Sequence, residues 1–261
     1  SVRNTTTGCI STIVPFTLTV SAAPSPNIAV SGALSAFAAC LGTVSSEQNF
    51  SVGGSFLTAN ITVTAPAGFE ISTTSGSGFG SSVVLPQVTG TVPSTTLYVR
   101  TTSSASGTPS GNITCVSTGA TTQNVAATAT VNVLPTITTS TLSNVSTTST
   151  TFNIPYTATT GSPNQYSLVT GTPTAMTGFT AVNNASLTTS PIVVTKPTAA
   201  AGTYNFNVTV RNSSTGCASA AVPITLTVVA PTINVSGTVS AFSACSGAAS
   251  AEQNINVSGI Y

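Results

Sequence analysis

The residues that could take part in chemistry are few in this chain of 261 residues. Seven carry charge, and they are Arg3, Glu47, Glu70, Arg100, Lys196, Arg211 and Glu252. The sequence has no His, and its three acids are all Glu. Acid–base catalysis usually needs His or paired carboxylates, and a nucleophilic Ser or Cys needs a base beside it. Because the candidates are so few and so scattered, the sequence predicts that this protein is not an enzyme.

Glu47 is the acid that recurs, because Glu252 occupies the same position in a second copy of its motif, "SSEQNF" and "AEQNIN". A ligand or a catalytic acid is one interpretation of Glu47. We favour the simpler one, in which Glu47 is a polar residue at a strand edge or the ion-pair partner of Arg100.

Sites for metals, cofactors, nucleic acid and membranes are not expected either. Calcium sites use several carboxylate oxygens and zinc sites use four Cys or His ligands, whereas the acids and cysteines here are scattered. Lys196 is the only lysine, and the segment 134–229 has no acid to support a lysine–asparagine isopeptide cross-link. The net charge of +1 comes without a basic cluster that could contact several phosphates. No apolar run approaches the ~20 residues of a membrane-spanning helix.

The five cysteines are the most suggestive residues, and they are Cys9, Cys40, Cys115, Cys217 and Cys245. We predict a disulfide between Cys40 and Cys115, which fall in one expected domain; the alternative is that both are buried free thiols. Such a bond would indicate an extracellular protein. Cys9, Cys217 and Cys245 are candidate inter-domain or free thiols. We expect Cys217 to be packed and unpaired, with a bridge to a neighbouring domain, for example to Cys245, as the alternative.

The chain contains a long internal repeat. "VSAFSACSGAASAEQNINVSG" (239–259) matches "LSAFAACLGTVSSEQNFSVGG" (34–54), 205 positions earlier, at twelve of twenty-one positions. "RNTTTGCISTIVPFTLTV" (3–20) returns as "RNSSTGCASAAVPITLTV" (211–228), 208 positions on. We therefore expect the sequence to start late in one repeat, to run through a whole one and to stop early in the next.

Short stretches of alternating apolar and polar residues, separated by turn residues, predict β-strands along the whole chain. Examples are "TANITVTAP" (58–66), "VAATATVNV" (125–133) and "YNFNVTVRN" (204–212). Fifteen Pro and 21 Gly argue against long helices. The pattern predicts an all-β fold of tandem immunoglobulin-like antiparallel β-sandwiches, arranged as beads along a filament.

The repeat divides this array into two kinds of domain. We expect a type-1 sandwich at 27–133 and a different, type-2 sandwich at 134–229. Residues 1–20 would be the closing strands of a preceding type-2 sandwich, and 230–261 the opening strands of a following type-1 sandwich. The larger aromatic residues should fill the cores and not form a sugar-binding platform; these are Phe37, Phe50, Phe69, Phe152, Tyr166 and Phe206.

Several of these motifs resemble a known family. "AEQNINVSG", "LTANITVTAPAGFEISTTSGSGFG" and "TPSGNITCVSTGATTQNVA" are similar to the Ig-like repeats of giant cell-surface adhesins of Bacteroidota bacteria. "FNIPYTATTGSPNQYSL" and "AGTYNFNVTVRNSSTGC" resemble the second module that alternates with them. The resemblance implies export by the type IX secretion system and a place in surface filaments, some of which serve gliding motility or attachment. It brings no catalytic residue and no cofactor.

The leading hypothesis is thus a structural repeat segment of an extracellular, cell-surface filament, whose partners are neighbouring repeats of the same filament. A second hypothesis is an adhesive Ig-like module that binds surface glycans or other cells. A third treats the chains as separate fibre subunits joined by strand exchange.

Overall fold

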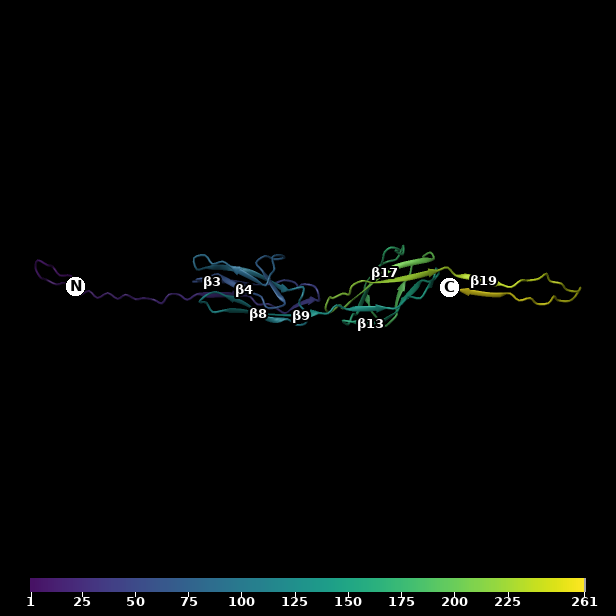
Figure 1. The fold of residues 1–261 in the computed structure, drawn as a ribbon, viewed down its shortest axis with the longest axis horizontal. Coiled ribbons are helices and arrows are strands. Elements are labelled where there is room, and N and C mark those ends of the chain that lie inside the picture. The colour runs from purple at the N-terminus through teal and green to yellow at the C-terminus, as the bar shows by residue number, and fades with distance from the viewer. Residues whose placement is uncertain (261) are drawn as a thin grey trace.

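The computed structural model describes residues 1–260, and within them it contains strands and no helix. Two β-sandwiches follow one another along the long axis of the molecule, with an extended segment beyond each of them (Figure 1). The predicted all-β fold of tandem Ig-like sandwiches is confirmed. Frequent Pro and Gly prevent long helices here, and β-branched residues favour the extended backbone.

Nine strands build the first sandwich. They are β1 (Asn27–Ser31), β2 (Phe37–Cys40), β3 (Gln48–Ser55), β4 (Ile61–Thr64), β5 (Phe69–Ser72), β6 (Ser82–Leu85), β7 (Val92–Thr101), β8 (Ser110–Val116) and β9 (Gln123–Asn132). One sheet has the order β1-β3-β7-β5 and the other β2-β9-β8-β4-β6. All pairs are antiparallel except β2 with β9, which is parallel. The parallel pair brings the end of β2 to the end of the last strand.

Nine further strands build the second sandwich. They are β10 (Thr136–Thr139), β11 (Val145–Ser146), β12 (Thr151–Ile154), β13 (Tyr156–Thr160), β14 (Gln165–Thr170), β15 (Val182–Ser186), β16 (Ile192–Thr195), β17 (Gly202–Arg211) and β18 (Val222–Val229). One layer is the sheet β11-β18-β17-β14-β15, and the other consists of the pairs β12-β16 and β10-β13. Pro155 separates β12 from β13, because proline has no amide hydrogen to give to a ladder.

Each sandwich has its own hydrophobic core, and no residue belongs to both. Period-two alternation places every second side chain between the sheets, as in β9 with its alternating buried and exposed residues. The six aromatic residues expected in the cores, Phe37, Phe50, Phe69, Phe152, Tyr166 and Phe206, are all buried, which confirms that prediction. No buried polar side-chain atom among the described residues lacks a hydrogen-bond partner.

The segments beyond the two sandwiches are only partly ordered into strands. Residues 11–26 are extended without strand pairing, and β19 (Thr232–Ser236) pairs with β20 (Asn256–Ile260) as a separate two-stranded ladder. In Figure 1 these segments project from opposite ends of the pair of sandwiches.

Candidate functional site

The junction between the two sandwiches is our candidate functional site, because a short linker, a close backbone contact and a disulfide meet there. β9 ends at Asn132 and β10 begins at Thr136, so the polypeptide crosses the junction in three residues. The loop at Gly161 packs on this linker. Gly161 has a φ of +70°, and a Cβ added there would lie 2.8 Å from the Cα of Pro135. Glycine is therefore required for the loop to approach the linker so closely.

The turn between β17 and β18 reaches the same end of the second sandwich. The side chain of Asn212 donates to the carbonyl of Gly161 at 3.1 Å. Asn164 and Ser213 form two hydrogen bonds, at 2.8 and 2.9 Å. Within the turn, the Asn212 amide donates to the carbonyl of Cys217 at 2.9 Å. These contacts place Cys217 at the end of the second sandwich that faces the first.

Cys40 occupies the corresponding end of the first sandwich. It is the last residue of β2, and the parallel ladder sets it opposite Asn132, the last residue of β9. The amide of Leu41 donates to the Asn132 carbonyl at 2.9 Å, and the Asn132 side chain donates to Ala39 at 3.3 Å. Cys40 is thus fixed beside the start of the linker.

Cys40 and Cys217 form a disulfide across this junction, with their Cα atoms 5.6 Å apart and 177 positions apart in sequence. That Cα separation is ordinary for a disulfide. Cys217 is 1 % exposed. The two sandwiches are therefore connected twice, once by a three-residue linker and once by a covalent bond between side chains.

The predicted Cys40–Cys115 disulfide is wrong, and so is the favoured expectation that Cys217 is unpaired. The alternative for Cys217, a bridge to a neighbouring domain, is what the structure shows, with Cys40 and not Cys245 as its partner. The ladder explains why. Cys115 lies opposite Gln123 at the start of β9, whereas Cys40 lies opposite Asn132 at its end. Nine residues at ~3.3 Å each separate the two levels by about 30 Å, far beyond the reach of a disulfide.

The remaining cysteines are free thiols. Cys115 is buried in the first core, and burial raises the pKa of its thiol to about 11. A thiol with so high a pKa is almost entirely protonated at neutral pH, so it is a poor nucleophile. Cys9 and Cys245 are exposed, in the segments beyond the sandwiches.

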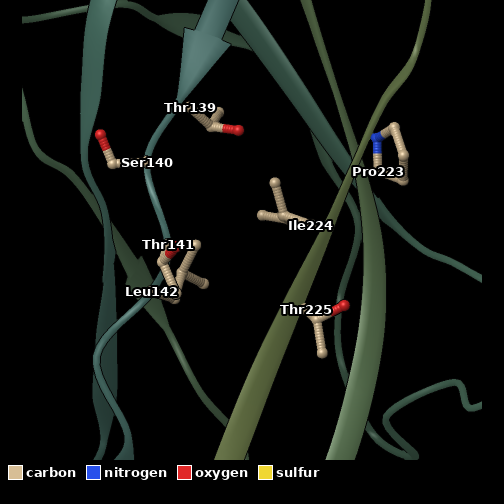
Figure 2. Close-up of a pocket in the computed structure, with 7 residues that line it drawn as sticks. All are labelled: Thr139, Ser140, Thr141, Leu142, Pro223, Ile224 and Thr225. Carbon is tan, nitrogen blue, oxygen red and sulfur yellow. The ribbon is translucent and has the colours of Figure 1, made fainter.

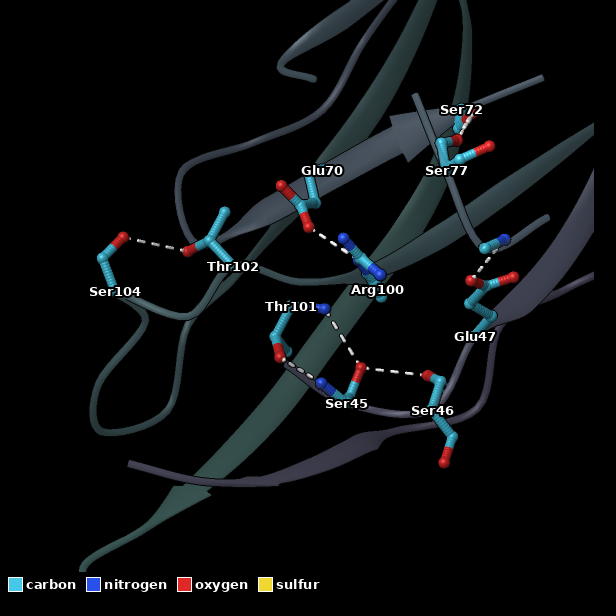
Figure 3. Close-up of polar contacts among 11 residues, drawn as sticks. Ser45, Ser46, Glu47, Glu70, Ser72, Ser77, Arg100, Thr101, Thr102 and Ser104 are labelled. Atoms are coloured by element: carbon cyan, nitrogen blue, oxygen red, sulfur yellow. Dashed lines mark hydrogen bonds and ion pairs between the residues drawn. The ribbon is translucent and has the colours of Figure 1, made fainter. Parts of the chain in front are cut away.

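The charged residues of the first sandwich form structural contacts (Figure 3). Glu70 and Arg100 face each other across β5 and β7 and form an ion pair, with Nε and Oε1 2.6 Å apart. Arg100 also lies over the ring of Phe79, with its Cζ 3.9 Å from the centroid. Glu47 accepts hydrogen bonds from Ser75 and from the Gly76 amide, both at 2.9 Å. The partner of Arg100 is thus Glu70, and the suggested pairing with Glu47 is wrong.

Lys196 is 3 % exposed, and its ammonium group donates to the carbonyl oxygens of Thr147 and Pro197 at 3.4 and 3.1 Å. Those contacts tie the loop after β11 to the end of β16. The described residues contain no group of three or more His, Cys, Asp or Glu side chains that could hold a metal ion. The search for a helix long and apolar enough to cross a membrane, made over the described part of the chain, finds none.

Shallow hollows lie along the second sandwich. The one in Figure 2 has a volume of about 260 Å³ and lies between the end of β10 and the start of β18. Its lining residues are Thr139, Ser140, Thr141, Leu142, Pro223, Ile224 and Thr225. None of these is titratable or aromatic, so the hollow offers hydroxyl groups and aliphatic carbon but no group suited to catalysis or to stacking on a sugar.

Comparisons with known proteins give likenesses of fold only. No family profile matches the chain, and no curated protein matches its sequence. A three-Ig-domain segment of titin, an E-to-A variant, is similar with 12 % identity and a TM-score of 0.38, over 80 % of this chain and 68 % of that one. The adhesin domain of Epf from Streptococcus pyogenes has 9 % identity and a TM-score of 0.29, over 71 % and 77 %. The BSP domain of a biofilm-associated protein has 14 % identity and a TM-score of 0.23, over 70 % and 29 %.

Proposed function

We propose that this chain is a structural repeat segment of an extracellular bacterial surface filament, a stalk that serves attachment or gliding motility. The observation that carries the proposal is the doubly connected junction. A three-residue linker and the Cys40–Cys217 bond together restrict rotation and bending between the sandwiches. A stalk needs this stiffness, whereas an isolated binding domain does not.

The segments outside the sandwiches support a continuing array. Residues 14–20 match residues 222–228 of β18 with a shift of 208 positions, so Phe16 corresponds to Ile224. Phe16 is 89 % exposed and Ile224 is 6 % exposed. Val20 is likewise exposed, while its counterpart Val228 is buried. Each apolar side chain gains ~1.5–3 kcal/mol on burial, which favours covering this strand with the rest of a type-2 sandwich.

The segment 230–260 has the same relation to the first sandwich. Phe242 and Val257 are exposed, whereas their counterparts Phe37 and Val52 are buried. We therefore assign residues 1–20 to a preceding type-2 sandwich and 230–261 to a following type-1 sandwich. A strand-exchange fibre would require these two ends to complete one sandwich between two chains. We do not favour it, because the two ends belong to different kinds of sandwich.

An extracellular location is supported by the disulfide, since such bonds persist in oxidising compartments. The finer assignment, to giant Bacteroidota adhesins exported by the type IX system, rests on the motif resemblance. Glycan or cell binding, the alternative role, has less support. The hollow in Figure 2 lacks aromatic side chains. Two other hollows of the second sandwich are lined in part by Phe152 and Tyr166, but these side chains are only 2 % and 8 % exposed, and the other four aromatic residues named above are also buried.

The test uses antibodies raised against the purified chain on intact cells of the source organism. We expect immunogold labelling along surface filaments, and a single very large polypeptide when surface material is separated on a denaturing, reducing gel. Labelling confined to the cytoplasm would refute the surface role. A band near the 25.6 kDa of this chain would refute the long covalent array and favour separate subunits.

A further inference from the structure

The exposed loop at residues 2–11 has the same internal structure as the loop 210–219 that carries Cys217. In both, the Asn amide donates to the Cys carbonyl and the Gly amide donates to the Asn carbonyl, each at 2.9 Å. In both, the Asn side-chain oxygen accepts hydrogen bonds from two further amides. The corresponding residues are Asn4 and Asn212, Gly8 and Gly216, and Cys9 and Cys217. The turn that presents Cys9 therefore has the same internal hydrogen bonds as the turn that presents Cys217.

Parts of the other half of the junction are also present near Cys245, although the copy of β2 itself forms no strand. β19 pairs with β20 in the register of β1 with β3, shifted by 205 positions. The side chain of Gln253 holds both backbone groups of Ser240, at 2.6 and 2.9 Å, as Gln48 holds those of Ser35. The turn after the cysteine repeats as well, since Gly42 and Gly247 have φ values of +85° and +87°.

We propose that Cys9 and Cys245 are half-sites of the same inter-domain disulfide in the adjoining repeats. Cys9 bonds to the cysteine equivalent to Cys40 in the sandwich before it, and Cys245 bonds to the cysteine equivalent to Cys217 in the sandwich after it. This inference rests on the proposed function, because it needs adjoining repeats. What distinguishes these thiols from the buried Cys115 is that each lies in a copy of a segment whose cysteine is already bonded.

Each bond forms by thiol–disulfide exchange with a disulfide donor of the extracellular compartment. One thiolate attacks the donor disulfide and gives a mixed disulfide with release of one donor thiolate. The second cysteine thiolate then displaces the other donor sulfur. Two electrons pass to the donor, and the two protons lost by the cysteines are taken up by the donor thiolates.

The consequence of the bonds is mechanical. Tension that enters before Cys40 and leaves after Cys217 crosses the disulfide and bypasses the 177-position loop, which contains most of both cores. In a continuous array, the load-bearing backbone of one repeat is the stretch from Cys217 to Cys245, which is 28 positions. Fully extended at ~3.4 Å per residue, that stretch spans about 95 Å. Unfolding of a domain in the oxidised fibre therefore cannot extend a repeat beyond about 95 Å of backbone plus the 5.6 Å between the Cα atoms of the disulfide.

The pairing of Cys245 is tested in a chain to which a second copy of residues 57–261 is joined after Tyr261, which corresponds to Phe56 in sequence. After refolding with oxidised glutathione and peptic digestion at acidic pH, we expect a disulfide-linked peptide that joins Cys245 to Cys217 of the second copy. The Cys245→Ser variant should leave that Cys217 free and keep the Cys40–Cys217 bond. Recovery of Cys245 as a free thiol, or bonded to any other cysteine, would overturn the proposal.

The bypass is tested by stretching single molecules of the 261-residue chain from both ends. Reduction should lengthen the fully stretched chain by about 60 nm, which is 177 residues at ~3.4 Å each. Cys40→Ser should behave as the reduced parent without reductant, and Cys9→Ser as the oxidised parent. Two domain-sized unfolding steps in the oxidised parent would refute the bypass. Both tests use purified chains, so their results are independent of the cell-surface labelling that tests the proposed function.

Discussion

The two cores should unfold as separate units, and a pair of matched substitutions tests this. Phe206 is 0 % exposed and lies between Phe152 and Phe179, with ring centroids 5.3 and 4.9 Å away. Removing a buried Phe side chain costs about 3–5 kcal/mol. Rigid aromatic neighbours resist collapse into the cavity, so we expect Phe206→Ala to fall in the upper half of that range. For a domain of this size the melting temperature should drop by roughly 15–30 °C.

Phe50→Ala is the matched control, because Phe50 is buried in the first core and absent from the second. The tyrosines separate the two signals. Tyr156, Tyr166 and Tyr204 lie in the second sandwich and Tyr98 in the first, and the chain has no Trp. Near-ultraviolet circular dichroism therefore reports mainly on the second sandwich. Labelling of the buried Cys115 with a thiol reagent, in a background of Cys9→Ser and Cys245→Ser, reports on the first.

Phe206→Ala should shift the dichroism transition and leave the temperature of Cys115 labelling almost unchanged, and Phe50→Ala should do the reverse. If each substitution moved both signals together by the same amount, the two sandwiches would form one cooperative unit. The description of the chain as beads with separate cores would then be wrong.

Three further predictions concern the bond, a buried hydrogen-bonded pair and a buried thiol. Cys217→Ser should lower the melting temperatures of both sandwiches. When either sandwich unfolds, the disulfide closes a loop of about 80–100 residues, and this loss of conformational entropy destabilises the unfolded chain by up to about 4–5 kcal/mol. Calorimetry without reductant checks this. Thr101→Val removes the hydroxyl that accepts the hydrogen bond of the buried Ser45 amide at 2.9 Å, so the free energy of unfolding measured by urea titration should fall by about 1–3 kcal/mol. Thr62→Val, at an exposed position, should change it by no more than about 0.5 kcal/mol. Burial raises the pKa of Cys115 to about 11, so between pH 9 and 11 the folded state keeps a proton that the unfolded state loses. The free energy of unfolding of the first sandwich should therefore fall by about 2 kcal/mol from pH 9 to 11 in urea titrations, and Cys115→Ala should remove that slope.

Much of the fold could be predicted because it depends on local pattern. Alternation in "VAATATVNV" identifies β9, and alternation in "YNFNVTVRN" identifies β17. The buried aromatic residues could be named for the same reason, since each lies on the apolar phase of its strand or beside it.

The disulfide could not be predicted, because it depends on which distant strands pair. Cys40 and Cys115 lie in the same sheet, and a bond between them was predicted because both fall in one expected domain. Their positions along β9 are fixed by the parallel register of β2 and the antiparallel register of β8. Neither register is encoded in a short stretch of sequence.

The segments beyond the sandwiches separate what local sequence determines from what packing determines. β19 and β20 keep the register of β1 and β3 without the rest of the sandwich. The copy of β2 at Phe242–Cys245 forms no strand, because the strand that β2 pairs with, β9, has no counterpart there. Residues 14–20 likewise form no strand, although their counterparts lie in β18, a strand of eight residues. The turn at Cys9 and the β19–β20 ladder are therefore present without the rest of a sandwich, whereas the strands that close a sandwich pair only where a neighbour is present. Cys40 and Cys217, with their copies Cys245 and Cys9, lie where such neighbours meet.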